Sequence, residues 1–191
     1  MKEIKNDERL NMLNHSCAHL LAHAVKHIYP QAKFWVGPVI NEGFYYDIDL
    51  GDVSLTDEDL PKIEKEMKKI SKDNKLIKRI ELSKEEALEM FKDDPYKIDL
   101  ISRMDEHEQV ISAYKQEDFI DLCRGPHVNS TKEIKYFKLL KVSGAYWKGD
   151  SKNKMLQRVY GICFENEEDL NEHLAYLEDC KNRDHRKIGK E

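Results

Sequence analysis

The chain has 191 residues, of which 36% are charged and 40% hydrophobic, and its formal net charge is −5. A chain of this length can bury a core without a disulfide or metal, and its regularly recurring apolar residues exclude a disordered protein. It has no apolar run long enough to span a membrane and no hydrophobic signal segment in "MKEIKNDERL", so we expect a cytoplasmic protein without membrane contact. The four cysteines form no CxxC pair, and we expect them to be reduced.

Charge is unevenly distributed along the sequence. Residues 131–158 carry eight Lys or Arg against two acidic residues, whereas residues 41–70 carry nine acidic residues against four Lys. An acidic protein with one basic side can still bind a polyanion locally. The alternative is solvated charge that has no partner.

The first predicted element is a long helix over about residues 8–29. Apolar side chains recur there at helical spacing, Asp7 is a suitable N-cap, and Pro30 ends the helix. A β-hairpin follows, because a short turn leads into alternating apolar residues over 44–50.

The middle of the chain predicts further helices and strands. A second helix begins after the N-cap Thr56 and presents a single apolar stripe. Residues 75–82 predict a strand, and the capping box of Ser83 and Glu86 predicts a short helix through Phe91. The stretch "YKIDLI", which follows next, fits either a helix or a strand.

The rest of the chain predicts mainly strands. These cover residues 109–115, 118–123, 136–142 and 154–164. Asn166 is the N-cap of a final helix. The expected class is therefore α+β: an antiparallel sheet on which the long N-terminal helix packs, with further helices.

Histidines stand at every fourth position of the first helix, at residues 15, 19, 23 and 27. Each step of four residues drifts by about 40° around a helix, so His15 and His27 differ by about 120°. Adjacent pairs can therefore converge on a ligand, but all four cannot. The alternative is a polar stripe on an ordinary helix, and spacing alone does not distinguish the two.

A second motif, "DLCRGPH", places Cys123 four residues before His127, with a Gly-Pro turn between them. Together with His15 and His19, these residues make a four-ligand set of a kind that zinc accepts. The first helix lacks the Glu of the HExxH motif, which argues against a zinc protease. Each pair by itself is a weak signal.

These two motifs, with "GPVINEGFYYD", "GAYWKGDSKNKMLQRVYG" and "RDHRKIGKE", resemble the editing domain of bacterial-type threonyl-tRNA synthetases. Alanyl-tRNA synthetases and free-standing editing proteins share this domain more distantly. The resemblance covers the chain from about Leu13 to its end. It implies a hydrolase that cleaves serine from tRNA(Thr) charged in error. Such a step is needed because one missing methyl group changes pocket affinity by only about 1–3 kcal/mol.

The resemblance also implies the residues of the editing cleft. The catalytic set is His15, His19, Lys97, Asp121, Cys123 and His127. The substrate-binding set is Tyr46, Asp47, Gly125, Tyr146, Trp147 and Lys148. In the family, a Lys and a His position the attacking water and the terminal ribose, so replacing Lys97 or His15 is expected to abolish cleavage with the fold intact. Cys123 as a nucleophile is disfavoured, because the sequence identifies no activating base beside it.

Several of these residues have ordinary interpretations from the pattern alone. Tyr46 alternates with apolar residues and reads as a sheet-core tyrosine, Asp47 as the end of a hairpin pair, and Lys97 as a solvated loop lysine. The aromatic pair at 146–147 fits the packing of a turn against the sheet, or a stacking surface for the tRNA acceptor end. His23 and His27 are interpreted as surface or packing residues.

The alanine-specific relatives bind zinc through the His15, His19, Cys123 and His127 pattern, whereas the threonyl enzymes edit without metal. Because the other motifs are threonyl-like, we expect no obligatory metal. The alternatives are a zinc-dependent deacylase of mischarged tRNA(Ala) and a tRNA-binding appendage without activity.

The expected organisation is an editing domain over residues 1–180 and a basic linker over 181–191, which would lead to a class II catalytic core that the chain lacks. The chain is then either part of a synthetase or a free-standing protein acting in trans, and it cannot activate threonine with ATP. The expected partners are the tRNA(Thr) acceptor end carrying serine and, for a fragment, the remaining synthetase domains.

Overall fold

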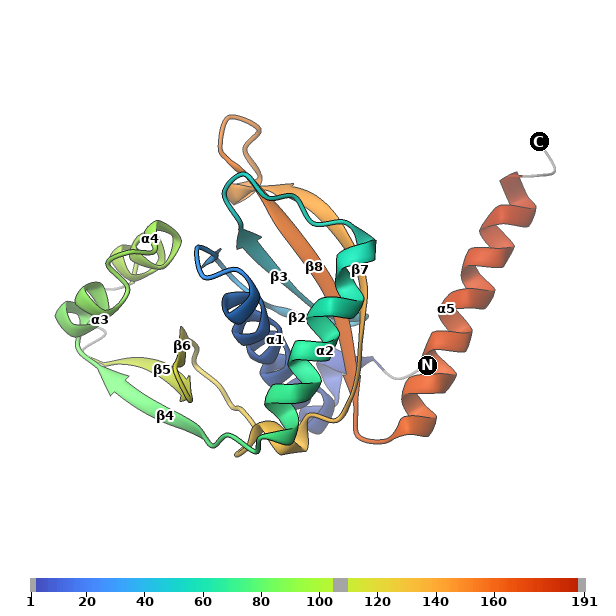
Figure 1. Ribbon diagram of the computed structural model, residues 1–191, viewed down its shortest axis with the longest axis horizontal. Coiled ribbons are helices and arrows are strands. Elements are labelled where there is room, and N and C mark those ends of the chain that lie inside the picture. Colours follow the sequence, from blue (N-terminus) through green and yellow to red (C-terminus); the bar gives the residue numbers. More distant parts are fainter. Residues whose placement is uncertain (1–2, 105–109, 189–191) are drawn as a thin grey trace.

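The computed structural model describes residues 3–104 and 110–188 (Figure 1). The strands of its larger sheet are β1 (Lys33–Phe34), β2 (Val39–Ile40), β3 (Gly43–Asp49), β7 (Tyr136–Tyr146) and β8 (Met155–Phe164). Those of the smaller sheet are β4 (Ile77–Leu82), β5 (Ile111–Gln116) and β6 (Phe119–Leu122). All pairings are antiparallel, with strand orders β1-β3-β8-β7, where β2 also pairs with β3, and β4-β5-β6.

The α-helices are α1 (Glu8–Ile28), α2 (Leu60–Lys72), α3 (Lys84–Met90), α4 (Pro95–Ser102) and α5 (Glu167–Ile188). Short 3₁₀ turns are η1 (Ile4–Asn6), η2 (Asp57–Asp59), η3 (Thr131–Glu133) and η4 (Trp147–Gly149). The predicted α+β class is therefore confirmed. No helix among the described residues is long and apolar enough to cross a membrane.

The main core lies between the larger sheet and the two helices α1 and α2. Helix α1 contacts α2, β3 and β8, while α2 contacts β7. The Asp7 side chain accepts the Leu10 amide at 3.0 Å and so caps α1 as predicted. Leu13, Leu20 and Leu21 on this helix are buried, and each such burial contributes about 1.5–3 kcal/mol. This packing holds α1 rigidly against the sheet.

A second core lies beneath the smaller sheet, where α3 and α4 cover it. It consists of Leu82, Ala87, Phe91, Ile101, Ile111 and Ala113. The predicted capping box is present, with the Glu86 amide donating to Ser83 Oγ at 3.1 Å. The ambiguous stretch after Pro95 is helix α4, because the Asp94 carboxylate accepts the amides of Tyr96 at 3.0 Å and Lys97 at 3.2 Å.

Three features differ from the sequence-based expectations. The strands divide between two sheets, and β1 was not predicted. Helix α5 continues to Ile188, so the expected boundary at residue 180 falls inside a helix. Figure 1 shows α5 extending away from the rest of the fold. Residue 109 of one predicted strand and residues 189–191 of the predicted linker lie outside the described residues.

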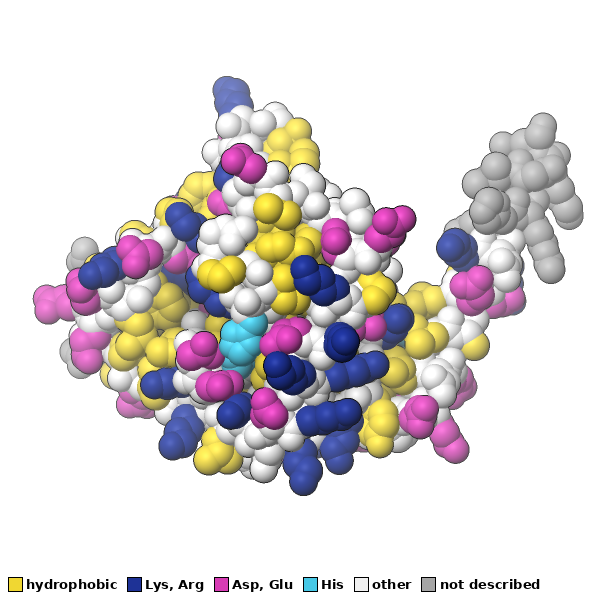
Figure 2. Space-filling view, viewed as in Figure 1, with side chains coloured by type: hydrophobic (Ala, Val, Ile, Leu, Met, Phe, Trp, Pro, Cys, Tyr) yellow, Lys and Arg dark blue, Asp and Glu magenta, His cyan; other side chains and the backbone are white. Residues whose placement is uncertain are grey.

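The basic surface is also wider than the segment 131–158 suggested. Figure 2 shows Lys and Arg side chains gathered across the lower middle of the visible face. The exposed side chains of α2 include Lys62, Lys65, Lys68, Lys69 and Lys72. Although residues 41–70 are acidic as a whole, the helix turns these lysines outward and buries Glu64, which accepts the Leu139 amide at 2.8 Å.

Candidate functional site

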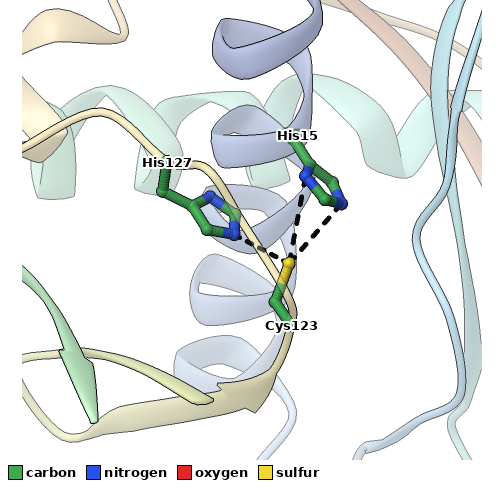
Figure 3. Close-up of side chains that lie close together, drawn as sticks. All are labelled: His15, Cys123 and His127. Carbon is green, nitrogen blue, oxygen red and sulfur yellow. Dashed lines mark hydrogen bonds between the residues drawn. The ribbon is translucent and has the colours of Figure 1, made fainter. Parts of the chain in front are cut away.

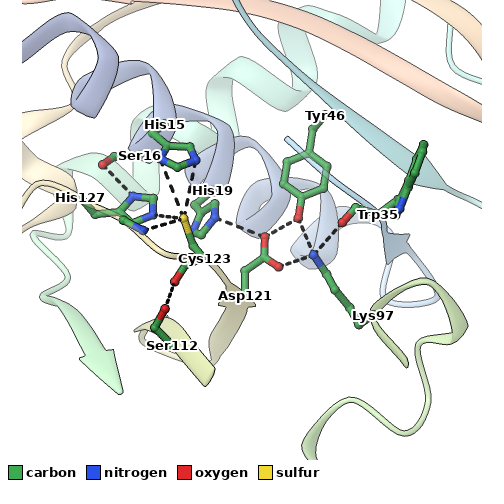
Figure 4. A network of polar contacts seen from close by, with 11 residues as sticks. His15, Ser16, His19, Trp35, Tyr46, Lys97, Ser112, Asp121, Cys123 and His127 are labelled. Carbon is green, nitrogen blue, oxygen red and sulfur yellow. Dashed lines mark hydrogen bonds and ion pairs between the residues drawn. The ribbon is translucent and has the colours of Figure 1, made fainter. Parts of the chain in front are cut away.

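A cavity of about 250 Å³ opens where α1 faces the end of β6. Its lining includes His15, His19, Tyr46, Lys97, Asp121 and Cys123. Figure 4 shows these side chains arriving from α1, β3, α4 and β6. The cavity thus joins segments that are far apart in the sequence, and it brings the predicted catalytic residues together.

Two of these residues, His15 and Cys123, form a tight cluster with His127 at one end of the cavity (Figure 3). His127 Nε2 lies 3.0 Å from Cys123 Sγ, and the two ring nitrogens of His15 lie 3.6 and 3.9 Å from the same sulfur. The rings of His15 and His127 stack, with their centroids 4.9 Å apart. A possible base therefore does stand beside the thiol, which the sequence alone did not reveal.

The hydrogen bonds of Ser16 indicate the tautomer of His127. Ser16 Oγ accepts the Val128 amide at 3.0 Å and lies 3.0 Å from His127 Nδ1. With one acceptor position taken, the hydroxyl proton is available to Nδ1. This arrangement favours the tautomer with its proton on Nε2, facing the sulfur of Cys123. In that state His127 is a donor to the thiol and not a base.

Burial keeps the cluster uncharged. It lowers the pKa of His127 to about 2, with help from His19 and His15, and lowers the pKa of His15 as well. Burial also holds the pKa of His19 well below its usual range. The same cause raises the pKa of the Cys123 thiol to about 11. At neutral pH the site therefore holds neutral imidazoles and a protonated thiol.

A buried ion pair forms the other end of the cavity. Lys97 Nζ lies 2.5 Å from Asp121 Oδ1, and both side chains are almost completely buried. The ammonium also donates to Tyr46 Oη at 3.1 Å and to the Trp35 carbonyl at 2.8 Å. The Tyr46 hydroxyl donates to Asp121, and His19 Nε2 lies 3.4 Å from the same carboxylate. Lys97 is thus no solvated loop residue, and Tyr46 is both a core residue and a polar wall of the cavity.

The turn after β6 depends on Gly125. Its φ is +78°, in the left-handed region, and an added Cβ would lie 2.1 Å from the Tyr114 hydroxyl. The Gly125 amide donates to Cys123 Sγ at 3.3 Å. This residue shapes the turn that carries Cys123 and His127.

Other predicted substrate-binding residues lie outside the lining. Asp47 points to the opposite side of β3 from Tyr46, as strand alternation requires. There it is paired with its cross-strand neighbour Arg158 at 2.8 and 3.0 Å. The Asp47 side chain therefore does not line this cavity, and its ion pair joins β3 to β8.

At the tip between β7 and β8, Trp147 and Lys148 contact helix α4. Trp147 packs edge to face on Tyr96 and Trp35, with centroids 5.1 and 6.5 Å away. Lys148 pairs with Asp99 at 3.0 Å, and Tyr146 is exposed. Trp147 and Lys148 thus support the helix that carries Lys97, and none of the three predicted residues lines the cavity.

The four helix histidines do not converge on one point, as the helical geometry predicted, and they separate into two pairs. His15 and His19 face the cavity, whereas His23 and His27 face Asp118 in the β5–β6 turn. His23 is fully buried and His27 is partly exposed, which agrees with the packing and surface interpretation.

The cavity offers three donors for a metal rather than four. His15, Cys123 and His127 have ligand atoms within 4.8 Å of one another. His19 is turned toward Asp121 instead. Donors bound at about 2.1 Å (nitrogen) and 2.3 Å (sulfur) in a tetrahedral site lie about 3.4–3.7 Å apart. The His15 distances suit such a site and the 3.0 Å contact of His127 is short, so the residues fit an incomplete zinc site.

Two contributors were not singled out from the sequence. Ser16 Oγ contacts His127 Nδ1 and so orients the imidazole ring, and the Trp35 carbonyl accepts a hydrogen bond from the Lys97 ammonium. Ser16 lies within the "HSCAH" motif itself, so its position was a usable signal. The contact of Lys97 with the Trp35 carbonyl involves a backbone atom, so no residue type in the sequence indicates it.

The "Threonyl and Alanyl tRNA synthetase second additional domain" family matches residues 111–160, which hold Asp121, Cys123 and His127. The chain is 59% identical to the threonine–tRNA ligase of Oceanobacillus iheyensis over 98% of its own length and 29% of that protein. It is 60% identical to the ligase of Anoxybacillus flavithermus over 96% of its own length and 29% of that protein. It is 55% identical to the ligase of Clostridioides difficile over 99% of its own length and 30% of that protein.

The chain belongs to the editing-domain family of threonyl- and alanyl-tRNA synthetases. Within this family, the relatives that match almost its whole length are threonine–tRNA ligases. The chain spans 29–30% of the length of these relatives.

Proposed function

We propose that this chain hydrolyses the ester of serine attached in error to tRNA(Thr), with no obligatory metal. The main support is the cavity where neutral His15 faces the buried Lys97–Asp121 pair. The family and the names of the relatives support the same activity. The partners would be the acceptor end of tRNA(Thr) carrying serine and, within a longer ligase, its other domains.

In the proposed reaction a water molecule attacks the ester carbonyl carbon. His15 takes a proton from this water as the new C–O bond forms. The tetrahedral oxyanion then collapses, and the bond to the ribose oxygen breaks. That oxygen receives the proton from His15, which yields serine and intact tRNA. An uncharged imidazole suits this part, since a protonated one has no free acceptor nitrogen.

Lys97 would contribute positive charge beside the developing oxyanion. Its ammonium already forms an ion pair with Asp121 and donates hydrogen bonds to Tyr46 Oη and the Trp35 carbonyl. Its effect is therefore mainly electrostatic, and a fixed charge in a buried site acts strongly without reorganisation.

Discrimination against threonine would follow from close packing around the cavity. The Tyr46 ring fills the space beside Gly37, where an added Cβ would meet it at 2.5 Å. An extra methyl group against such a wall costs about 1–3 kcal/mol. Threonyl-tRNA(Thr) would then escape hydrolysis, while the ester of seryl-tRNA(Thr) is cleaved.

The activity is tested by measuring deacylation of seryl-tRNA(Thr), threonyl-tRNA(Thr) and seryl-tRNA(Ala), each with and without a chelator. We expect rapid hydrolysis of the first alone and no effect of the chelator. Loss of activity in chelator would favour a zinc-dependent deacylase, above all with turnover of seryl-tRNA(Ala). No turnover of any substrate would favour a tRNA-binding domain without activity.

Replacing Cys123 with Ser distinguishes water attack from a covalent route. Because the thiol is protonated and His127 is oriented as a donor, we expect the variant to keep hydrolysis to within about tenfold of the parent chain. A nucleophilic thiolate would need a lowered pKa. Trapping of a seryl-enzyme, or a loss of activity of about 10³ or more, would contradict the proposal.

A further inference from the structure

A second side-chain cluster lies on α1 outside the cavity. His23 and His27 project one turn apart toward the two-residue turn between β5 and β6, which holds Glu117 and Asp118. Asp118 Oδ1 lies 3.0 Å from His23 Nε2 and 3.3 Å from His27 Nε2. Glu117 Oε2 lies 3.9 Å from His23 Nε2. All four ligand atoms are within 4.8 Å of one another.

We propose that His23, His27, Glu117 and Asp118 bind a divalent transition-metal ion, with zinc the best match. Four donors at about 2.1 Å from one ion lie about 3.4 Å apart in a tetrahedral site. The observed separations of 3.0, 3.3 and 3.9 Å lie around this value. Adjustments of a few tenths of an ångström, in side chains that are mostly exposed, would complete the geometry.

Groups behind the cluster hold both imidazoles in the required orientation. His27 Nδ1 is 3.1 Å from Glu66 Oε1, which directs its Nε2 to the cluster. This is the carboxylate–histidine arrangement found behind many metal ligands. His23 Nδ1 is 3.0 Å from the amide of buried Gln116. When metal takes Nε2, Nδ1 carries the proton, and a rotated Gln116 amide accepts it through Oε1.

The charge and chemistry of the donors select the ion. Two neutral imidazoles and two carboxylates carry −2, which balances a dication. Imidazole with carboxylate suits zinc, nickel or cobalt, whereas magnesium and calcium prefer oxygen donors alone. Lys75 Nζ, 3.6 Å from Glu117 Oε1, would compete weakly for this carboxylate.

The turn itself is unusual for a hairpin. Glu117 has φ +56°, in the left-handed region that tight turns normally assign to Gly. A side chain there costs roughly 1–2 kcal/mol, and such strain often marks a functional position. The strained residue is the one whose carboxylate completes the cluster.

Such an ion would join α1 to the β5–β6 hairpin close to the cavity. His23 lies one helical turn after His19, and Asp118 precedes Asp121 by three residues. The site is nevertheless separate from the cavity and does not depend on the proposed hydrolysis.

The test is titration of the 191-residue chain with Zn²⁺ and Co²⁺ in the Cys123→Ser background, which removes the thiol of the cavity cluster. We expect one ion per chain and a cobalt spectrum without a thiolate charge-transfer band. Adding His27→Gln with Asp118→Asn should weaken binding at least about 100-fold, and Glu66→Gln roughly 10–100-fold. Asp52→Asn, an exposed loop change of equal charge, should have no effect.

Two results would overturn the site. One is the absence of stoichiometric binding at micromolar Zn²⁺ in the Cys123→Ser chain. The other is binding that survives the His27→Gln and Asp118→Asn pair unchanged. Circular dichroism confirms that these surface variants remain folded.

Discussion

Lys97→Met is expected to slow hydrolysis of seryl-tRNA(Thr) by about 10²–10³ and to lower the free energy of unfolding by about 3–5 kcal/mol. The rate falls because the fixed positive charge beside the ester is lost. Stability falls because Asp121 remains buried without its partner. Single-turnover deacylation and urea denaturation measure the two effects. The buried pair thus changes the expectation, drawn from sequence, that Lys97 can be replaced with the fold intact.

A second change separates the two effects. Adding Asp121→Asn to Lys97→Met removes the unpaired charge, so most of the stability should return while hydrolysis stays low. Lys92→Met serves as the matched control, since Lys92 is exposed and forms an ion pair with Glu89, which is exposed as well. Near-normal hydrolysis in the stable double variant would show that Lys97 has no part in the reaction.

His15→Ala is expected to reduce hydrolysis by about 10²–10⁴, the range for loss of a positioned acid or base. Stability should change by only about 1 kcal/mol, because the ring is half-buried and its polar contacts are the long ones to Cys123. Asn11→Ala, one helical turn earlier and outside the cavity lining, is the control.

The pH profile gives a second measure of His15. Burial lowers its pKa, with Asp121 opposing the shift. The neutral, proton-accepting form therefore persists below pH 6.5, and hydrolysis should fall only at lower pH than for an exposed imidazole. An acid limb centred above pH 6.5, or an unchanged rate in His15→Ala, would contradict the assignment.

Much of the fold was predictable because local signals carried it. The cap at Asp7 and the capping box at Ser83 each involve residues three positions apart, so the sequence shows both partners at once. The helical drift of about 40° per four residues likewise shows that the four histidines cannot converge on one point, although it does not say which pair faces the cavity. The division of strands between two sheets depends on pairings between distant segments, which no local pattern encodes.

The site was less predictable from residues alone. Lys97 appeared as a loop lysine until α4 formed on the Asp94 cap and Asp121 was found beside it. The resemblance placed both Tyr46 and Asp47 near the cleft, but alternation along β3 sends these neighbouring side chains to opposite faces. Two residues that are adjacent in a strand therefore need not belong to the same site.

The sequence by itself determined the α+β class, the packed first helix, the inability of its four histidines to converge and, by resemblance, the family. Helical periodicity and helix caps involve residues that are only a few positions apart, so the sequence shows them directly. Only the tertiary structure decided that Lys97 is buried against Asp121, that His127 Nε2 lies 3.0 Å from Cys123 Sγ, and that Asp47 pairs with Arg158. The two ion pairs depend on burial and on partners 24 and 111 residues away in the sequence, and a charge is stabilised by its surroundings in space.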